Sequence, residues 1–212
     1  MDSGPQPDGS RPAIGAARTG RRRAGARDGR SPSHDGRWGW LAPLGPTPVR
    51  LTPENVVASM SIRWLGGMTV RGRFMDVRGM IHLPADDADT VGVTVEIRAD
   101  SVRTGILLRD RHLRGPLFLD AARHPVITFR GSDLMRLPTH IAMAGSLTIR
   151  GVTRTEELRC AITDSDAHRA ISADVTLSRR AYDVGVPRGL RRLDPLFVVI
   201  GDDVRIQIRV EL

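Results

Sequence analysis

The charged segment Arg109–Arg114 contains the residues of this chain that are best suited to chemistry. Guanidinium and imidazole groups form charge-assisted hydrogen bonds with phosphate or carboxylate groups. On a helix, Arg109 and His112 would share one face. Asp110 and Arg114, four residues apart, would form a pair. The segment predicts a head-group site at the end of a β structure, or a structural clamp in which Arg109 and Asp110 bond to neighbouring strands. Both alternatives stay open.

Catalysis is the competing prediction for this segment. His112 would act as a general base beside Asp110 or Asp120, in a hydrolase or isomerase that acts on the bound ligand. The sequence contains no G-x-S-x-G motif, and Cys160 lies on an alternating segment where a small apolar core residue is expected. We therefore expect a protein that is not an enzyme.

The histidines do not have the spacing of a metal site. No His lies two or four residues from another His or from the cysteine, so no ligand pair is offered. A glycine-rich phosphate loop is also missing, because Gly66-Gly67 resembles a hairpin turn with no helix after it. The sequence predicts no metal and no cofactor. The six histidines are His34, His82, His112, His124, His140 and His168.

The first 50 residues differ in composition from the rest. They contain 9 Gly and 7 Pro, and their apolar residues show no period. We expect residues 1–48 to form a disordered tail and residues 49–212 to form one folded domain.

Residues 1–50 carry 9 Arg and 4 Asp, a net charge of 9 − 4 = +5, which leaves 23 − 20 = +3 for the other residues. This balance does not favour a specific nucleic-acid partner for the folded domain. An interaction protein with a filled interior, acting through its basic tail, is a further alternative.

Targeting signals are not evident in the sequence. Arg21–Arg23 is not followed by the apolar core of about 7–15 residues that a secretory signal needs. No apolar run approaches the roughly 18 residues of a membrane span. With one cysteine, no internal disulfide can form. We expect a cytoplasmic protein without a membrane span, and a homodimer remains an open alternative.

From residue 54 onward the apolar residues alternate with polar ones, which indicates β-strands. Eight strands with short connections and one helical insertion predict an all-β antiparallel barrel. Gly72 and Gly79 are expected at a sharp bend of one long strand. The predicted strands are Val56–Arg63, Met68–Gly79, Val91–Asp100, Ile127–Leu137, His140–Arg150, Val152–Thr163, His168–Leu177 and Asp203–Leu212.

The interior of such a barrel is either packed or able to hold a small ligand. Small residues on the inner face favour a cavity, and methionines suit a wall that adapts to an apolar guest. The alternative is ordinary gap-filling in a packed core. The small candidates are Ala58, Gly72, Ala99, Ala144 and Ala173, and the methionines are Met60, Met68 and Met143.

Four sequence blocks in register resemble the YceI-like family of polyisoprenoid-binding, lipocalin-like proteins, over about residues 50–212. The family usually has two aromatic residues before the aspartate that corresponds to Asp120. In this chain Phe118 occupies the first of these positions, and Leu119 occupies the second. The four blocks are Thr69–Phe74 with Gly79, Arg109–Phe129, Gly145–Thr153, and Ser178–Gly185 with Gly201–Val204.

The resemblance implies an eight-stranded barrel around a long apolar tunnel that binds isoprenoid quinones, prenyl diphosphates or related lipids without catalysis. We therefore expect a carrier or sequestering protein for a long-chain lipid, with Arg109 and His112 at the head group. The predicted wall consists of Val70, Phe74, Val93, Val95, Leu113, Phe118, Phe129, Met143, Leu147 and Tyr182.

Overall fold

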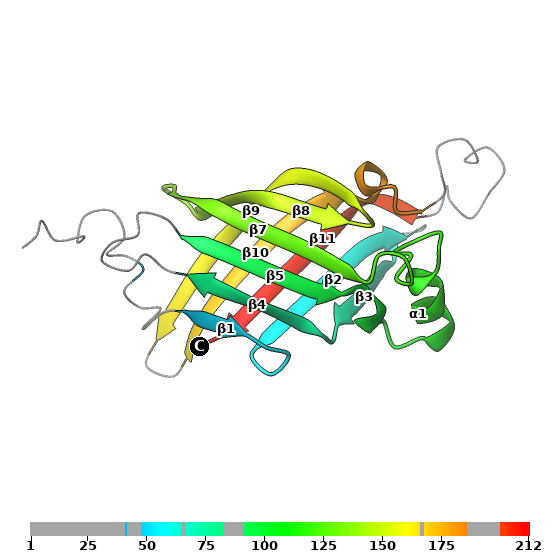
Figure 1. Cartoon of the computed structure of the whole chain (residues 1–212), viewed down its shortest axis with the longest axis horizontal. Coiled ribbons are helices and arrows are strands. Elements are labelled where there is room, and N and C mark those ends of the chain that lie inside the picture. The colour runs from blue at the N-terminus through cyan, green and yellow to red at the C-terminus, as the bar shows by residue number, and fades with distance from the viewer. Residues whose placement is uncertain (1–40, 42–47, 65–66, 83–90, 166–167, 186–199) are drawn as a thin grey trace, which may run out of the picture. The chain divides into compact units, whose positions relative to one another are not determined.

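The computed structural model describes residue 41 and residues 48–64, 67–82, 91–165, 168–185 and 200–212. Within these residues, eleven strands form one antiparallel sheet that curls around an interior (Figure 1). The all-β class and the single helical insertion are confirmed. The strands are β1 (Val49–Leu51), β2 (Val56–Trp64), β3 (Thr69–Phe74), β4 (Val77–His82), β5 (Gly92–Arg98), β6 (Val102–Arg103), β7 (Val126–Arg136), β8 (Ile141–Ile149), β9 (Val152–Ser165), β10 (His168–Ser178) and β11 (Ile200–Glu211).

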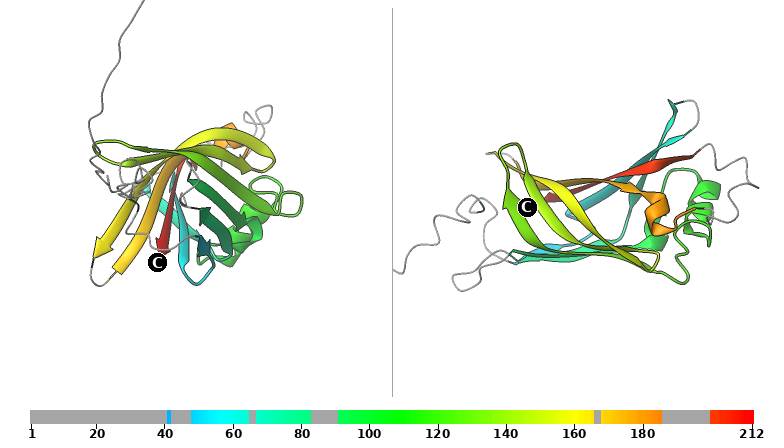
Figure 2. Two further views of the ribbon diagram at one scale, coloured as in Figure 1. Left: turned by 60° about the vertical axis from the view of Figure 1, so that its left-hand side comes forward. Right: turned by 90° about the horizontal axis from the view of Figure 1, so that it is seen from above.

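The strand order explains the curl of the sheet. It runs β1-β4-β5-β7-β8-β9-β10-β11-β2-β3-β6. β3 and β4 follow each other in the chain, yet β3 pairs with β2 and β4 pairs with β5. One continuous segment therefore reaches both ends of the sheet, which can happen only if the sheet bends back on itself. Two views from other directions show the same curled arrangement (Figure 2).

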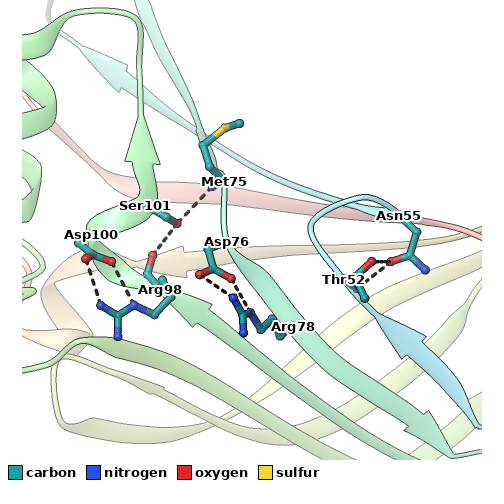
Figure 3. Close-up of polar contacts among 8 residues, drawn as sticks. All are labelled: Thr52, Asn55, Met75, Asp76, Arg78, Arg98, Asp100 and Ser101. Atoms are coloured by element: carbon teal, nitrogen blue, oxygen red, sulfur yellow. Dashed lines mark hydrogen bonds and ion pairs between the residues drawn. The ribbon is translucent and has the colours of Figure 1, made fainter.

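The predicted count of eight strands is wrong, because the expected long strand breaks at Met75 and Asp76. The Met75 amide donates to the backbone and hydroxyl oxygens of Ser101, each at 3.2 Å, instead of to a ladder partner. The Arg98 amide donates to the Asp76 carbonyl at 3.0 Å, and the Arg78 side chain binds the Asp76 carboxylate at 2.9 Å (Figure 3). These bonds hold the break at which the chain passes from β3, paired with β2, to β4, paired with β5. The short edge strands β1 and β6 complete the eleven.

Glycine is required where β4 approaches β5. A Cβ atom at Gly79 would lie 2.1 Å from the carbonyl oxygen of Thr94, so a side chain there would displace the backbone. Gly79 was predicted to lie at the bend of the strand, but the structure gives it another role. The glycine permits tight pairing of two strands, and the bend itself lies three residues earlier.

One end of the sheet carries the helical elements. Helix α1 (Leu107–Arg114) follows β6, and two 3₁₀ turns, η3 (Ala99–Ser101) and η4 (Arg179–Tyr182), precede β6 and follow β10. Among the described ranges, no helix is both long and apolar enough to cross a bilayer. The predicted disordered tail, residues 1–48, lies outside the described residues except for Leu41, which packs in the apolar core, and Pro48.

Candidate ligand-binding site

The curled sheet encloses a large apolar cavity. Its volume is about 980 Å³, at the upper end of the roughly 300–1,000 Å³ that is typical of ligand pockets. Alternation produces this wall, because every second side chain of a strand points to the inner face. β2, β3, β5 and β7–β11 all contribute residues to it, and α1 with the loop after it borders the same cavity.

The structure places ten of the twelve predicted site residues on this cavity. Val93 and Met143 instead line a second, smaller cavity of about 90 Å³, and Val95 and Phe129 border both cavities. A role for any of them in contacting a ligand stays a prediction. The ten are Val70, Phe74, Val95, Arg109, His112, Leu113, Phe118, Phe129, Leu147 and Tyr182.

More than two thirds of the residues that line the large cavity were not among the predicted site residues. Eleven of these residues lie on β2, β9, β10 and β11, strands whose alternation was visible in the sequence. Of the small and methionine candidates for the cavity wall, Met60 lines the large cavity, and Met143 and Ala173 line the smaller one. The other candidates line neither cavity: Ala58, Gly72, Ala99, Ala144 and Met68. The wall residues of these four strands that sequence reasoning left out of the site are Met60, Ile62, Arg63, Trp64, Leu158, Val175, Leu177, Ile200, Val204, Ile206 and Ile208.

Thr104 connects α1 to the end of the sheet. The Asp110 carboxylate accepts hydrogen bonds from the Thr104 amide at 2.7 Å and from its hydroxyl at 2.5 Å. The Arg109 side chain donates to the Thr104 hydroxyl at 2.7 Å and to its carbonyl at 2.9 Å. The clamp predicted for Arg109 and Asp110 is thus present, although its partner is a loop residue.

The predicted pair between Asp110 and Arg114 is not formed among the described contacts. The Arg114 side chain instead donates to the Val102 carbonyl at 3.0 Å. Burial by itself raises the pKa of the Asp110 carboxyl, but the hydrogen bonds from Thr104 and the charge of Arg114 outweigh burial. The pKa of Asp110 therefore lies below its usual value. This carboxylate is ionised and buried, and its Oδ1 accepts both hydrogen bonds from Thr104 that hold α1.

Replacing Asp110 with alanine is expected to lower the free energy of unfolding by about 2–3 kcal/mol, because the amide and hydroxyl of Thr104 lose their acceptor. The folded pKa is lowered, so the stabilisation is complete above the unfolded pKa of about 3.9 and is lost as pH falls through the folded value. Urea unfolding at neutral and at acidic pH measures both effects. The exposed Asp203→Ala serves as the control and should change stability by less than about 0.5 kcal/mol. Equal losses in the two variants would contradict the assignment.

Arg150 binds the segments at the rim of the cavity together. Its side chain donates to the carbonyl of Asp183 and, at 2.6 Å, to the carbonyl of Pro116. The Gly185 amide donates to the Leu117 carbonyl at 2.7 Å. The β8–β9 turn, the loop after α1 and the segment after η4 therefore form one connected rim. Arg150 lies within the sequence block Gly145–Thr153 that carries the family resemblance, but no role was predicted for it.

Tyr182 places a polar group inside the apolar wall. It is 1% exposed, and its hydroxyl donates to the Glu156 carboxylate at 2.6 Å. Burial, together with this carboxylate, raises the pKa of the Tyr182 phenol well above its usual range. The phenol therefore stays neutral and its hydrogen bond is internally satisfied, which leaves the ring to form part of the apolar wall.

The described residues do not contain the arrangement that the catalytic alternative requires. None of their hydrogen bonds joins His112 to Asp110 or Asp120. Asp120 is buried and lies 3.6 Å from the Arg123 guanidinium. Burial raises the pKa of the Cys160 thiol to about 11, so this thiol is protonated at neutral pH. In the same ranges, no group of three or more His, Cys, Asp or Glu side chains could hold a metal ion.

Sequence comparison identifies a family for this chain. Residues 50–212 match the YceI-like domain family. A UPF0312 protein of Yersinia pestis is 32% identical over 110 residues, which cover 52% of this chain and 57% of that protein. A UPF0312 protein of Pectobacterium atrosepticum is 32% identical over 105 residues, covering 50% of this chain and 55% of that protein. The chain thus spans a little over half the length of these relatives.

Solved structures share the fold at low identity. BcnA of Burkholderia cenocepacia superposes with a TM-score of 0.64 at 18% identity, covering 74% of this chain and 96% of that one. A polyisoprenoid-binding domain of Saccharophagus degradans gives 0.58 at 15% identity, with 77% and 96% covered. The YceI protein of Campylobacter jejuni gives 0.54 at 24% identity, with 71% and 88% covered.

Proposed function

This chain belongs to the YceI-like domain family, and on that premise we propose that it binds a long-chain isoprenoid or related lipid in its interior. It carries or sequesters that lipid without changing it chemically. The observation that carries this proposal is the apolar cavity of about 980 Å³ inside the curled sheet. The polyisoprenoid-binding domain of Saccharophagus degradans, which has a similar fold, supports the ligand class.

Enclosure alone is enough to bind such a ligand. Burial of apolar surface contributes about 25 cal/mol per Å², or about 0.8 kcal/mol for each methylene group. A chain with many carbon atoms therefore gains affinity along its whole length, with no need for polar contacts. The wall offers few polar groups, and the hydroxyl of Tyr182 is already bonded to Glu156. This composition fits a hydrocarbon chain better than a polar substrate.

The polar end of the lipid is placed at the mouth, beside Arg109 and His112. Both residues border the cavity, and His112 is exposed. Arg109 uses Nε and Nη2 to bond Thr104, and its Nη1 forms no hydrogen bond within the described part of the chain. Arg109 could therefore serve the clamp and still contact an anionic or carbonyl-bearing head group.

Two alternatives compete with the carrier. A filled interior acting through the basic tail is disfavoured by the cavity itself, which is far larger than a water molecule. Catalysis at His112 is disfavoured because Asp110 is engaged with Thr104 and Asp120 lies beside Arg123. Among the described residues, neither carboxylate is hydrogen-bonded to the imidazole, as orientation of a general base would require.

Native mass spectrometry of the freshly purified full chain, followed by organic extraction, tests the proposal. We expect a mass increment of one lipid per chain and a long-chain isoprenoid or related lipid in the extract. A bare chain that also fails to bind added polyprenols and isoprenoid quinones would contradict it. Conversion of an added lipid to a product by the wild type, lost in His112→Ala, would favour the enzyme.

A further inference from the structure

We propose that the mouth of the cavity docks on the surface of an anionic lipid bilayer. Six exposed apolar residues, here called the mouth patch, carry this inference. They form more than half of the ten large apolar side chains that are exposed in the described part of the chain. The mouth patch consists of Trp64, Met68, Ile106, Leu107, Leu108 and Leu117.

The mouth patch comes from two segments at the same end of the sheet. Trp64 and Met68 belong to the β2–β3 connection, where the Trp64 amide donates to the Met68 carbonyl at 2.7 Å. The other four belong to α1, to the residue before it and to the loop after it. Trp64 and Leu108 border the same cavity, so the two segments face one opening. The β2–β3 connection and α1 lie at the same end of the sheet in Figure 2.

Helix α1 exposes apolar and cationic side chains on one face. Leu107 is 76% exposed and Leu108 is 62% exposed. Arg111 follows these residues by one turn and is exposed too, whereas Asp110, the residue before it, is buried. Apolar groups beside arginines are typical of helices that lie in the interface of a bilayer. An exposed apolar patch of this kind marks a binding surface rather than a solvated face.

The charge of the mouth selects the kind of bilayer. Arg63 and Arg111 are exposed at the opening, and neither forms an ion pair with any described residue. The carboxylates of Asp110 and Asp120 are buried and engaged in internal contacts. The exposed charged residues of α1 and of the mouth end of β2 are therefore all basic, with Asp203 on the neighbouring β11 as an exposed carboxylate beside them. The excess of positive charge on α1 and β2 attracts anionic lipids. The same charge opposes association of this surface with a second copy of itself.

The apolar surface is continuous from the mouth patch into the cavity. Ile106, Leu108 and Leu117 are exposed and also line the cavity wall. A hydrocarbon chain could therefore leave a docked bilayer and enter the interior without crossing water. This step rests on the proposed function, whereas docking itself can be measured on vesicles that contain no isoprenoid.

Flotation of the full chain with vesicles tests the docking. The vesicles are phosphatidylcholine alone or an equimolar mixture with phosphatidylglycerol. The variant Met68→Asp/Leu107→Asp changes two exposed residues that do not line the cavity. An aspartate in the first turn of α1 also suits the helix dipole. We expect the wild type to bind the anionic vesicles in preference to phosphatidylcholine alone. We expect the variant to bind the anionic vesicles at least about tenfold more weakly than the wild type does.

A matched variant controls for the basic tail and for added charge. Val57→Asp/Met135→Asp changes two exposed apolar residues near the other ends of β2 and β7, and should bind vesicles as the wild type does. Both variants keep the 9 Arg of the first 50 residues, so attraction by the tail is equal in each. Equal vesicle binding by the mouth-patch variant and the wild type would overturn the proposal.

Two further measurements separate the outcomes. Light scattering after size exclusion shows whether the wild type is a dimer that the mouth-patch variant makes monomeric. A wild-type dimer that becomes monomeric in the variant, together with no vesicle binding by the wild type, would mean that the mouth patch contacts a second copy of this chain. That outcome would overturn the docking proposal. Uptake of a fluorescent polyprenol reports on the cavity. If all variants take up the polyprenol and only the mouth-patch variant loses binding to vesicles, docking is supported. If the wild type binds vesicles but takes up no polyprenol, only the proposed function is contradicted.

Discussion

Replacing Val175 with tryptophan is expected to weaken lipid binding by about 100-fold or more. Val175 lies on β10, and its side chain lines the large cavity. Its partner on the neighbouring strand β11 is Ile206, which is also apolar and lines the same cavity. An indole there occupies space that the lipid would fill. Exclusion of about four methylene groups, each contributing about 0.8 kcal/mol, corresponds to about 3 kcal/mol and thus to two orders of magnitude in Kd.

Thr176→Trp is the matched control, because Thr176 is the next residue of the same strand and is exposed on the outer face. We expect its Kd for a fluorescent polyprenol to equal that of the wild type. Circular dichroism and urea unfolding of both variants establish that each is folded, since overpacking itself costs about 1–3 kcal/mol. Equal affinities of the two folded variants would place the lipid outside the cavity and contradict the carrier proposal.

The sequence contained most of the information about the wall. Alternation in β3 and β5 identified Val70, Phe74 and Val95 as inward residues, and the structure places all three on the cavity. This success has a simple physical basis. A strand that is buried on one face must present an apolar residue at every second position, and that period is visible without any knowledge of pairing.

Alternation in the sequence did not predict the number of strands or the register between β7 and β8. The break at Met75 and Asp76 depends on backbone hydrogen bonds to Ser101 and Arg98, more than twenty residues away. A register shift between Gly131 and Asp133 changes how β7 meets β8. Such features arise from pairing between distant segments, for which a single sequence carries no local signal.

The polar contacts at the mouth were predictable in residue type but not in partner. The clamp that was one alternative for Arg109 and Asp110 is present, whereas the head-group role of Arg109 stays a prediction. Thr104, which binds both residues, carried no sequence pattern. Arg150 and Arg179 were missed because they bind backbone carbonyls. Every residue has a carbonyl, so the sequence around an arginine does not reveal which carbonyls it will reach.

Arg179→Met is expected to lower the free energy of unfolding by about 3–4 kcal/mol. Arg179 is 6% exposed, and its guanidinium donates to three backbone carbonyls. The distances are 2.8 Å to Gly201, 3.0 Å to Val184 and 3.2 Å to Ile200. Methionine keeps much of the side-chain volume but leaves these acceptors without the donor, at about 1–3 kcal/mol for each buried group that water does not reach.

The neighbouring Arg180 separates this effect from a loss of charge. Arg180 is exposed and lies 3.6 Å from the Asp202 carboxylate, so Arg180→Met should cost about 1 kcal/mol or less. Arg179→Lys should recover only part of the loss, because a single ammonium group cannot reach three carbonyls in the geometry of a guanidinium fork. Urea unfolding of the three variants at neutral pH gives the comparison. Equal losses in Arg179→Met and Arg180→Met would show that the three carbonyl bonds do not hold η4 against β11, and that the rim beside Val184 and Ile200 is stabilised in another way.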